Sequence, residues 1–374
     1  MYSIQSQYLK DSADLGEYWF CFLVMNLCFL LSYYVAFHHK KSHFLKILIL
    51  VFCIFAFWDH DFWGLAHSFF GILDDEEDFK EIIYEYIRTA SFGSYSLFRL
   101  YIWGGATFFV LKTIRLYGLP QNLFLYIFLV FYLLTFSYPR ASLAISMYFY
   151  GFSKLLYANK RNYRQIFVGV LFITASFFFH RSMLVTIMLT PFAYFRFNKK
   201  RLFVLLIAAP FIAEFFLSFM IGIIGNVPMS NGMFEQFVIS SNSYVVVMGE
   251  SEEYNWKFTL IRYFRFSSFY ILMLYIAYIM YSKKNVFLKQ ESRLFSMVVV
   301  IAIFSTLFLG SDMLGLNIIG YRYLFMTGIP LCILTTLAVM RKQCGWNQLQ
   351  LLLLPAFFYA EGFIFGKILS LYGN

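Results

Sequence analysis

Six arginines and one histidine of this chain stand where apolar stretches end, which is an unusual place for charge. Arginine can donate two hydrogen bonds at once to a phosphate, so a group of arginines is typical of an anion site. A histidine among them can serve as a general base near neutral pH. The positions are Arg99, Arg140, Arg181, Arg262, Arg265, Arg322 and His180. They come from different apolar stretches and share one expected depth, so we expect several of them to bind one phosphate or pyrophosphate.

Two acids complete the candidate site. Asp59 and Asp61 follow the second apolar stretch, and two acids at this spacing can accept a proton from a hydroxyl or bind a divalent metal. Simpler explanations exist for each residue. An arginine can extend to the membrane surface or pair with a nearby acid, the histidine can bond to loop backbone, and the acids can form a polar helix end. Because there are six such arginines, a shared anion site is as good an explanation as these separate structural roles.

The composition decides which kind of protein carries these residues. Of 374 residues only 13% are charged, whereas 61% are apolar and 23% are aromatic. Ordinary globular proteins have about 25% charged residues, so a soluble domain could not cover this much apolar surface. The composition therefore excludes a soluble enzyme, a disordered chain and a secreted disulfide scaffold. The net charge of +10 lies in short clusters between apolar stretches, which indicates membrane topology and no binding of nucleic acid.

A helix needs about 20 apolar residues to cross a bilayer, and we count about twelve candidate stretches, several of them short. We therefore predict an all-α, polytopic integral membrane protein that forms one transmembrane domain over residues 1–374. Long external loops are expected at about 59–95 and 225–257, the first with an amphipathic helix whose apolar face carries Ile83, Tyr86 and Ile87. The expected spans are 18–37, 44–58, 96–111, 121–137, 141–158, 165–180, 182–197, 202–224, 258–281, 294–309, 322–340 and 348–368.

Lysine and arginine predict the orientation of the spans. Alternate loops carry most of the basic residues, and the other loops carry nearly all the acids, for example Asp74–Asp78. Since cytoplasmic loops are rich in lysine and arginine, both termini should face the side of the membrane opposite the cytoplasm, and the candidate site should lie near that outer surface. The five cysteines have no metal-binding or CxxC spacing. We expect neither a metal nor a cofactor.

Four short segments carry a family resemblance. They are Trp58–Trp63 (WDHDFW), Pro139–Ser146 (PRASLAIS), Phe179–Leu184 (FHRSML) and Gly320–Tyr323 (GYRY). In order and spacing they resemble the EpsG-like branch of the Wzy-type polysaccharide polymerases, and the second and third are the most telling pair. The first segment has two acids with Phe and Trp where the family usually has one Asp and a Tyr. This difference leaves open which acid matters.

The resemblance implies a glycosyltransferase whose architecture is similar to that of the GT-C class. Such an enzyme joins undecaprenyl-pyrophosphate-linked oligosaccharide repeat units into O-antigen or exopolysaccharide at the periplasmic face of the bacterial inner membrane. Donor and acceptor are then both lipid-linked oligosaccharides. A chain-length regulator protein and a flippase are the expected protein partners, beside membrane lipid.

On this hypothesis the arginines stabilise the charge that develops on the pyrophosphate, with Arg140 and Arg322 as the main ligands. The supporting ligands are Arg181, Arg262, Arg265 and Arg99. The base for the acceptor hydroxyl is Asp61, His180 or Asp59.

Three other functions compete with this hypothesis. The main alternative is a flippase or exporter of lipid-linked glycan, but transporters usually place charge near the bilayer midplane and often have inverted repeats. An O-antigen ligase shares the donor chemistry of a polymerase. A membrane acyltransferase that decorates glycans is the remaining alternative.

Overall fold

The computed structural model describes residues 13–38, 43–54, 56, 60–71, 82–134, 138–158, 162–195, 198, 201, 204, 256–282, 286–309 and 317–372. Within these ranges some side chains are not described, among them those of His60, Asp61, Arg262 and Arg322. The described residues form fourteen α-helices, a π-helical segment (η3) and a 3-10 segment (η4), and they contain no strand. The prediction of an all-α fold is therefore confirmed.

Contacts group the chain into two compact units, Met1–Met188 with Cys332–Asn374, and Leu189–Leu331. The first unit contains α2 (Leu15–Phe37), α3 (His43–Ile54), α4 (His60–Phe70), α5 (Ile82–Ala90), α6 (Tyr95–Leu116), α7 (Gln121–Ile127), η3 (Phe128–Leu133), α8 (Pro139–Tyr157), α9 (Tyr163–Phe179), α10 (Met183–Leu189) and α17 (Trp346–Tyr372). The second contains η4 (Thr190–Tyr194), α13 (Trp256–Ser282), α14 (Lys289–Leu309) and α15 (Asn317–Met326), and α16 (Gly328–Met340) runs from the second unit into the first. The single domain over 1–374 stays a prediction.

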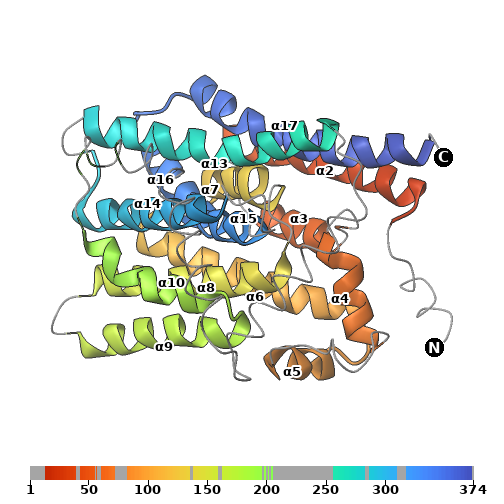
Figure 1. Ribbon diagram of the computed structural model, residues 1–374, viewed down its shortest axis with the longest axis horizontal. Coiled ribbons are helices and arrows are strands. Elements are labelled where there is room, and N and C mark those ends of the chain that lie inside the picture. The colour runs from red at the N-terminus through yellow and green to blue at the C-terminus, as the bar shows by residue number, and fades with distance from the viewer. Residues whose placement is uncertain are drawn as a thin grey trace, which may run out of the picture. The chain divides into compact units, whose positions relative to one another are not determined.

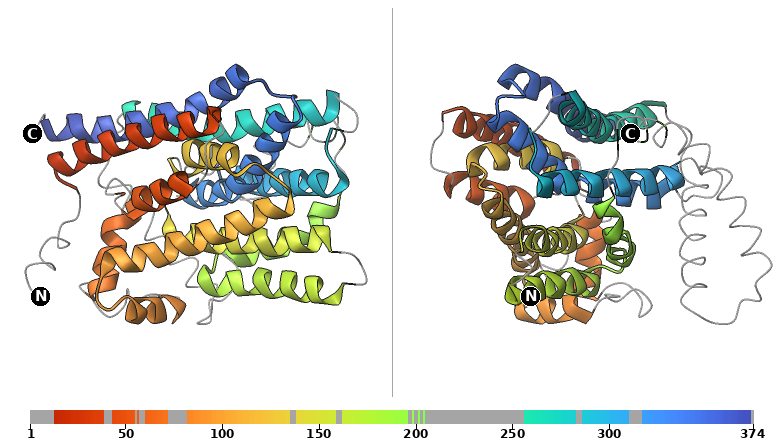
Figure 2. Two further views of the ribbon diagram at one scale, coloured as in Figure 1. Left: turned by 180° about the vertical axis from the view of Figure 1, so that it is seen from behind. Right: turned by 90° about the vertical axis from the view of Figure 1, so that its left-hand side faces the viewer.

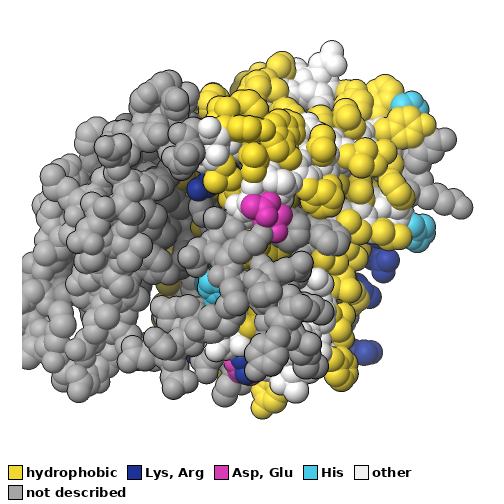
Figure 3. Space-filling view, turned by 90° about the vertical axis from the view of Figure 1, so that its right-hand side faces the viewer, with side chains coloured by type: hydrophobic (Ala, Val, Ile, Leu, Met, Phe, Trp, Pro, Cys, Tyr) yellow, Lys and Arg dark blue, Asp and Glu magenta, His cyan; other side chains and the backbone are white. Residues whose placement is uncertain are grey.

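Four described helical stretches are long and apolar enough to cross a membrane, namely Leu15–Phe37, Tyr95–Leu116, Phe264–Ser282 and Trp346–Tyr372. On α2 the side chains of Leu23, Leu27 and Leu30 are 63%, 54% and 62% exposed. Figure 3 shows one face on which hydrophobic side chains cover much of the described surface. Apolar surface of this extent marks contact with lipid or protein. Together these features indicate a multi-pass membrane protein.

Within the first unit α8 packs against α6 on one side and against α9 on the other (Figure 1). The connection between α8 and α9 is short, so the two helices form an antiparallel hairpin. They approach most closely at Gly151 and Gly169, where a Cβ atom on Gly151 would lie 2.6 Å from the carbonyl oxygen of Gly169. Only residues without a side chain permit this distance between two helix backbones.

The first and last long helices of this unit, α2 and α17, also lie side by side (Figure 2). The Asn26 side chain of α2 lies near the Glu361 carboxyl group of α17, and its Nδ2 donates to the carbonyl oxygen of Phe22 at 3.0 Å. Trp346, at the start of α17, stacks on the ring of Tyr126 at 5.8 Å. A polar pair and an aromatic pair therefore join α17 to the helices at the beginning of the chain.

One predicted span, 322–340, is two helices. It begins earlier, at Asn317, and it is interrupted at Thr327 between α15 and α16. Pro330 is the physical cause, since a proline cannot donate to the carbonyl oxygen of Met326 four residues earlier and its ring clashes with that carbonyl group. The hydroxyl and amide of Thr327 instead bond to the carbonyl oxygen of Leu324, at 2.6 and 3.0 Å.

The first predicted external loop contains two helices. One of them is α5, which confirms a helix in the predicted amphipathic segment. Tyr84 is fully buried, whereas Tyr86 is 71% exposed. The other is α4, which the sequence analysis did not predict. Nearly all of the predicted span 202–224 and of the predicted loop 225–257 lies outside the described residues.

Candidate functional site

The α8–α9 hairpin carries Arg140 and His180 to the same end. Arg140 is the second residue of α8, and His180 is the residue at which α9 ends. Counted from the Gly151–Gly169 contact, Arg140 is 11 residues away along α8 and His180 is 11 residues away along α9. At about 1.5 Å per residue the two helices rise equally from that contact. Two residues that are 40 positions apart in the sequence therefore share one end of the hairpin.

Tyr84 of α5 contacts both of these helix ends. Its hydroxyl donates to the carbonyl oxygen of Arg140 at 3.2 Å, and its ring centroid is 5.9 Å from Cζ of the Arg140 guanidinium. The same ring meets Phe179, the residue before His180, edge to face at 6.3 Å. Because Tyr84 is fully buried, it fixes the start of α8 against the end of α9.

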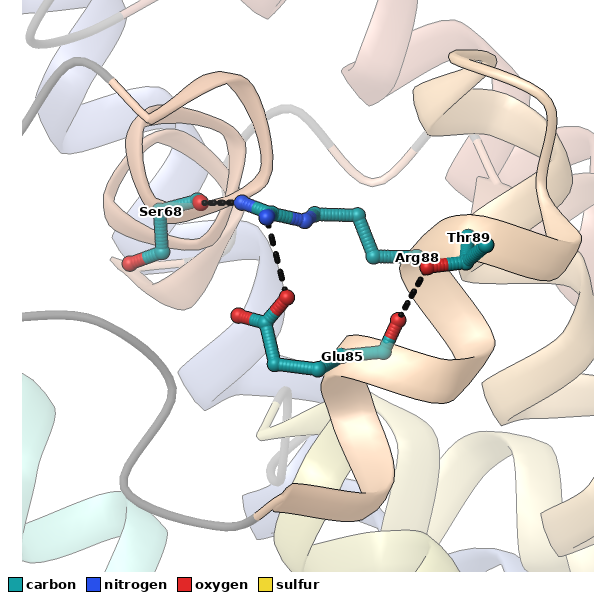
Figure 4. A network of polar contacts seen from close by, with 4 residues as sticks. All are labelled: Ser68, Glu85, Arg88 and Thr89. Carbon is teal, nitrogen blue, oxygen red and sulfur yellow. Dashed lines mark hydrogen bonds and ion pairs between the residues drawn. The ribbon is translucent and has the colours of Figure 1, made fainter.

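The position of α5 is fixed in turn by α4 (Figure 4). Arg88 forms an ion pair with Glu85 at 2.9 Å, and its Nη1 reaches the carbonyl oxygen of Ser68 at the far end of α4, at 3.5 Å. Both side chains of the ion pair are about one third exposed, so the pair adds little stability. Its effect is to orient Arg88 toward α4.

Replacing Tyr84 by phenylalanine should remove the bond to Arg140 and leave the packing. A hydrogen bond of this kind contributes about 1 kcal/mol to stability, so we expect a melting temperature lower by about 2–4 °C in a protein of this size. The control is Tyr86→Phe on the exposed side of the same helix, which should leave the melting temperature unchanged. An equal fall in the melting temperature of both variants would contradict the role of Tyr84.

An arginine at the N-terminal end of a helix is electrostatically unfavourable, so Arg140 at the start of α8 suggests a functional role. The helix dipole places positive partial charge at the start of α8, which disfavours a cation and favours an anion. Tyr138 provides no side-chain hydrogen bond to the first turn. Arg140 is partly exposed there, so its guanidinium and the first amides of α8 can act on the same anion.

His180 and Arg181 form the turn between α9 and α10. The amide of His180 donates to the carbonyl oxygen of Ser176, and its ring Nδ1 lies 2.6 Å from Oγ of Ser182. The ring is partly buried, whereas Arg181 is exposed. The structure therefore places three predicted site residues, Arg140, His180 and Arg181, at this end of the hairpin.

Arg99 has a different environment, because it is fully buried within the first unit. Its Nε and Nη2 donate to the carbonyl oxygen of Cys53 in α3, at 3.3 and 2.7 Å. Its Cζ lies 4.6 Å from the ring centroid of Phe62 in α4, whose carbonyl oxygen accepts a bond from the Tyr95 hydroxyl at 2.5 Å. These contacts join α6 to α3 and α4, and the role of Arg99 as a pyrophosphate ligand stays a prediction.

The second unit contains the remaining predicted arginines. The Cζ of Arg265, on α13, lies 4.1 Å from the ring centroid of Phe325 on α15, a cation–π contact. Arg322 precedes Phe325 by one helical turn on α15, and Arg262 precedes Arg265 by one turn on α13. Within this unit the structure thus brings Arg265 to the helix that carries Arg322.

The two predicted acids cannot be placed in the same detail. Asp59 lies outside the described residues, and Asp61 lies on α4 with its side chain not described. In the part of the chain that the structure describes, no three His, Cys, Asp or Glu side chains gather as metal ligands do. The roles of both acids, and the expectation that no metal is bound, stay predictions.

Comparison with models of protein families shows to which family the chain belongs. The EpsG family model matches residues 81–369, which is most of the chain. The chain belongs to the EpsG family. No curated protein and no solved structure gives a significant match. EpsG membership links the chain to exopolysaccharide biosynthesis.

The EpsG match includes three of the four resembling segments, those around Arg140, His180 and Arg322, and it begins after the segment with Asp59 and Asp61. It also includes two site residues that the sequence analysis missed. Tyr84 gave no signal of its own, because its burial depends on contacts with α8 and α9. Ser182 was visible within the histidine turn, but its bond to the His180 ring depends on the turn geometry.

Proposed function

We propose that this EpsG-family protein is a polymerase. It is a glycosyltransferase that joins undecaprenyl-pyrophosphate-linked oligosaccharide repeat units into O-antigen or exopolysaccharide at the periplasmic face of the bacterial inner membrane. The observation that carries the proposal is the common position of Arg140 and His180 at one end of the α8–α9 hairpin, where Tyr84 fixes both helix ends. The family's link to exopolysaccharide biosynthesis supports it.

The proposed reaction transfers a glycosyl group between two lipid-linked molecules. The bond between the anomeric carbon of the donor and the pyrophosphate oxygen breaks, and the pyrophosphate leaves with the electron pair. The acceptor hydroxyl oxygen bonds to that carbon and gives its proton to a base. Negative charge grows on the leaving group, so a fixed guanidinium such as that of Arg140 binds the transition state more strongly than the ground state.

The remaining residue roles follow the family resemblance and the sequence. Asp61, Asp59 or His180 takes the proton of the acceptor hydroxyl. Further pyrophosphate ligands come from the predicted arginines, and neither a metal nor a cofactor takes part. These arginines are Arg322, Arg181, Arg262, Arg265 and Arg99.

The proposed membrane arrangement has about twelve spans, an architecture like that of the GT-C class, and both termini in the periplasm. Four described helical stretches of sufficient length support a multi-pass arrangement. Donor and acceptor then reach the site from the membrane as lipid-linked oligosaccharides. A flippase supplies them and a chain-length regulator controls the product.

Deletion of the gene in a strain that makes a lipid-linked surface polysaccharide tests the proposal. We expect the deletion strain to carry a single repeat unit on its lipid core. A plasmid copy of the gene should restore the full ladder of polymer lengths on a gel. Loss of a flippase or of a ligase would leave no repeat unit on the lipid core, and loss of an acyltransferase would leave full-length polymer without acyl groups. Gel electrophoresis of the polysaccharide separates these outcomes, and either of the last two would contradict a polymerase.

A further inference from the structure

In the turn between α9 and α10, the ring nitrogen Nδ1 of His180 contacts Ser182. Ring Nδ1 lies 2.6 Å from Oγ of Ser182 and accepts from the backbone N–H of Ser182 at 3.4 Å. The backbone of His180 is held as well, because its amide donates to Ser176 and its carbonyl oxygen accepts from the amide of Met183 at 2.9 Å. Contacts within one turn thus fix the ring.

These contacts decide which ring nitrogen carries the proton. A backbone N–H can only donate, so Nδ1 must be the acceptor and carries no hydrogen. The Ser182 hydroxyl can rotate to donate to the same lone pair. A neutral imidazole has one N–H, which then lies on Nε2. The lone pair that a general base would use is already engaged by Ser182.

We propose that Ser182 is a positioning residue that holds His180 with its proton on Nε2. In this form His180 donates a hydrogen bond to the pyrophosphate of the lipid-linked donor, and it does not take the proton of the acceptor hydroxyl. This inference rests on the proposed function and narrows it, because the base is then one of the two acids. Nε2–H and the Arg140 guanidinium supply donors of the kind that a pyrophosphate oxygen accepts.

Two substitutions of His180 distinguish a role as hydrogen-bond donor from a role as general base. A glutamine amide nitrogen falls near the place of Nε2 and donates, but an amide does not accept a proton near neutral pH. An alanine provides neither function. With a donor role, His180→Gln should keep polymer formation within about tenfold of wild type, whereas His180→Ala should lose about 100- to 1,000-fold. If glutamine is as inactive as alanine at equal membrane levels, the donor role is wrong.

The asparagine variant is the matched control for the position of the donor. Its amide nitrogen falls near Nδ1, so His180→Asn has the same chemistry as His180→Gln in the wrong place. We expect it to be as inactive as His180→Ala. Activity of the asparagine variant equal to that of the glutamine variant would contradict a donor at Nε2.

The tautomer itself can be measured without any substrate. In ¹⁵N-histidine-labelled protein in lipid nanodiscs, the signals that disappear in His180→Gln belong to His180. We expect an unprotonated Nδ1 and a protonated Nε2, a mixture of tautomers in Ser182→Ala, and the wild-type pattern in Ser182→Thr, which keeps the hydroxyl. A protonated Nδ1 in the wild-type protein would overturn the proposal. This measurement needs no polymer. It can therefore contradict the proposed role of Ser182 even if the deletion experiment supports a polymerase, and the reverse also holds.

Discussion

Replacing Arg140 by alanine should reduce polymer formation by about 100- to 1,000-fold without loss of the protein from the membrane. Removal of one fixed donor to a developing negative charge has an effect of this size. The hydrogen bond between α5 and the start of α8 persists in the variant, because the Tyr84 hydroxyl donates to the backbone carbonyl oxygen of residue 140. The measurement is the polysaccharide ladder and its initial rate at matched protein levels.

Two further variants make this result specific. Arg140→Lys keeps the charge but loses the two-pronged donor, so its activity should lie between those of wild type and alanine. Arg164→Ala removes an exposed arginine from the opposite end of the same hairpin, near the start of α9, and should leave the ladder unchanged. A wild-type polysaccharide ladder from Arg140→Ala would contradict a role for Arg140 in binding the pyrophosphate.

A methyl group at Gly151 should destabilise the protein by about 2–3 kcal/mol, the upper part of the range for overpacked interiors. The added Cβ would lie 2.6 Å from the carbonyl oxygen of Gly169 and 2.9 Å from the amide nitrogen of Ile173. Both are backbone atoms of α9, so no side-chain rotation relieves the contact and the helices must separate. Thermal unfolding in detergent, followed by gel filtration of the remaining monodisperse protein, measures the loss.

The control is Gly104→Ala on α6. A Cβ atom there has no neighbour within 4 Å, so alanine should be neutral or stabilise the helix by up to about 1 kcal/mol. Because separation of α8 from α9 also moves Arg140 relative to His180, Gly151→Ala should lower polymer formation as well. Equal melting temperatures for the two variants would show that α8 and α9 do not approach at this glycine.

Most helices could be predicted from the sequence because each needs a long apolar stretch. The stretches predicted at 18–37, 96–111 and 348–368 correspond to α2, α6 and α17. The helix α4 was missed because it is too short to span and lies in a loop with acids, although Phe62, Ala66 and Phe69 repeat at helical spacing and are buried. The split of one predicted span at Pro330 was also missed, although the proline was visible.

The site could be predicted only in part. Arginine and histidine at the ends of apolar stretches are visible in a sequence, and this signal selected Arg140 and His180, which the structure places at one end of the α8–α9 hairpin. The same signal selected Arg99, whose contacts with Cys53 and Phe62 depend on the packing of three helices. For α5, the spacing of apolar residues selected Tyr86, whereas the structure buries Tyr84, because docking on α8 and α9 decides which face is covered.

The α8–α9 hairpin has a consequence for how the protein is made. Its two helices and the short connection between them occupy one continuous part of the chain, residues 139–179. The ribosome completes this part before it begins α13, and a helical hairpin can enter the bilayer as soon as both of its helices exist. The contact between Gly151 and Gly169, which puts Arg140 and His180 at one end of the hairpin, can therefore form while the arginines of α13 and α15 have yet to be translated.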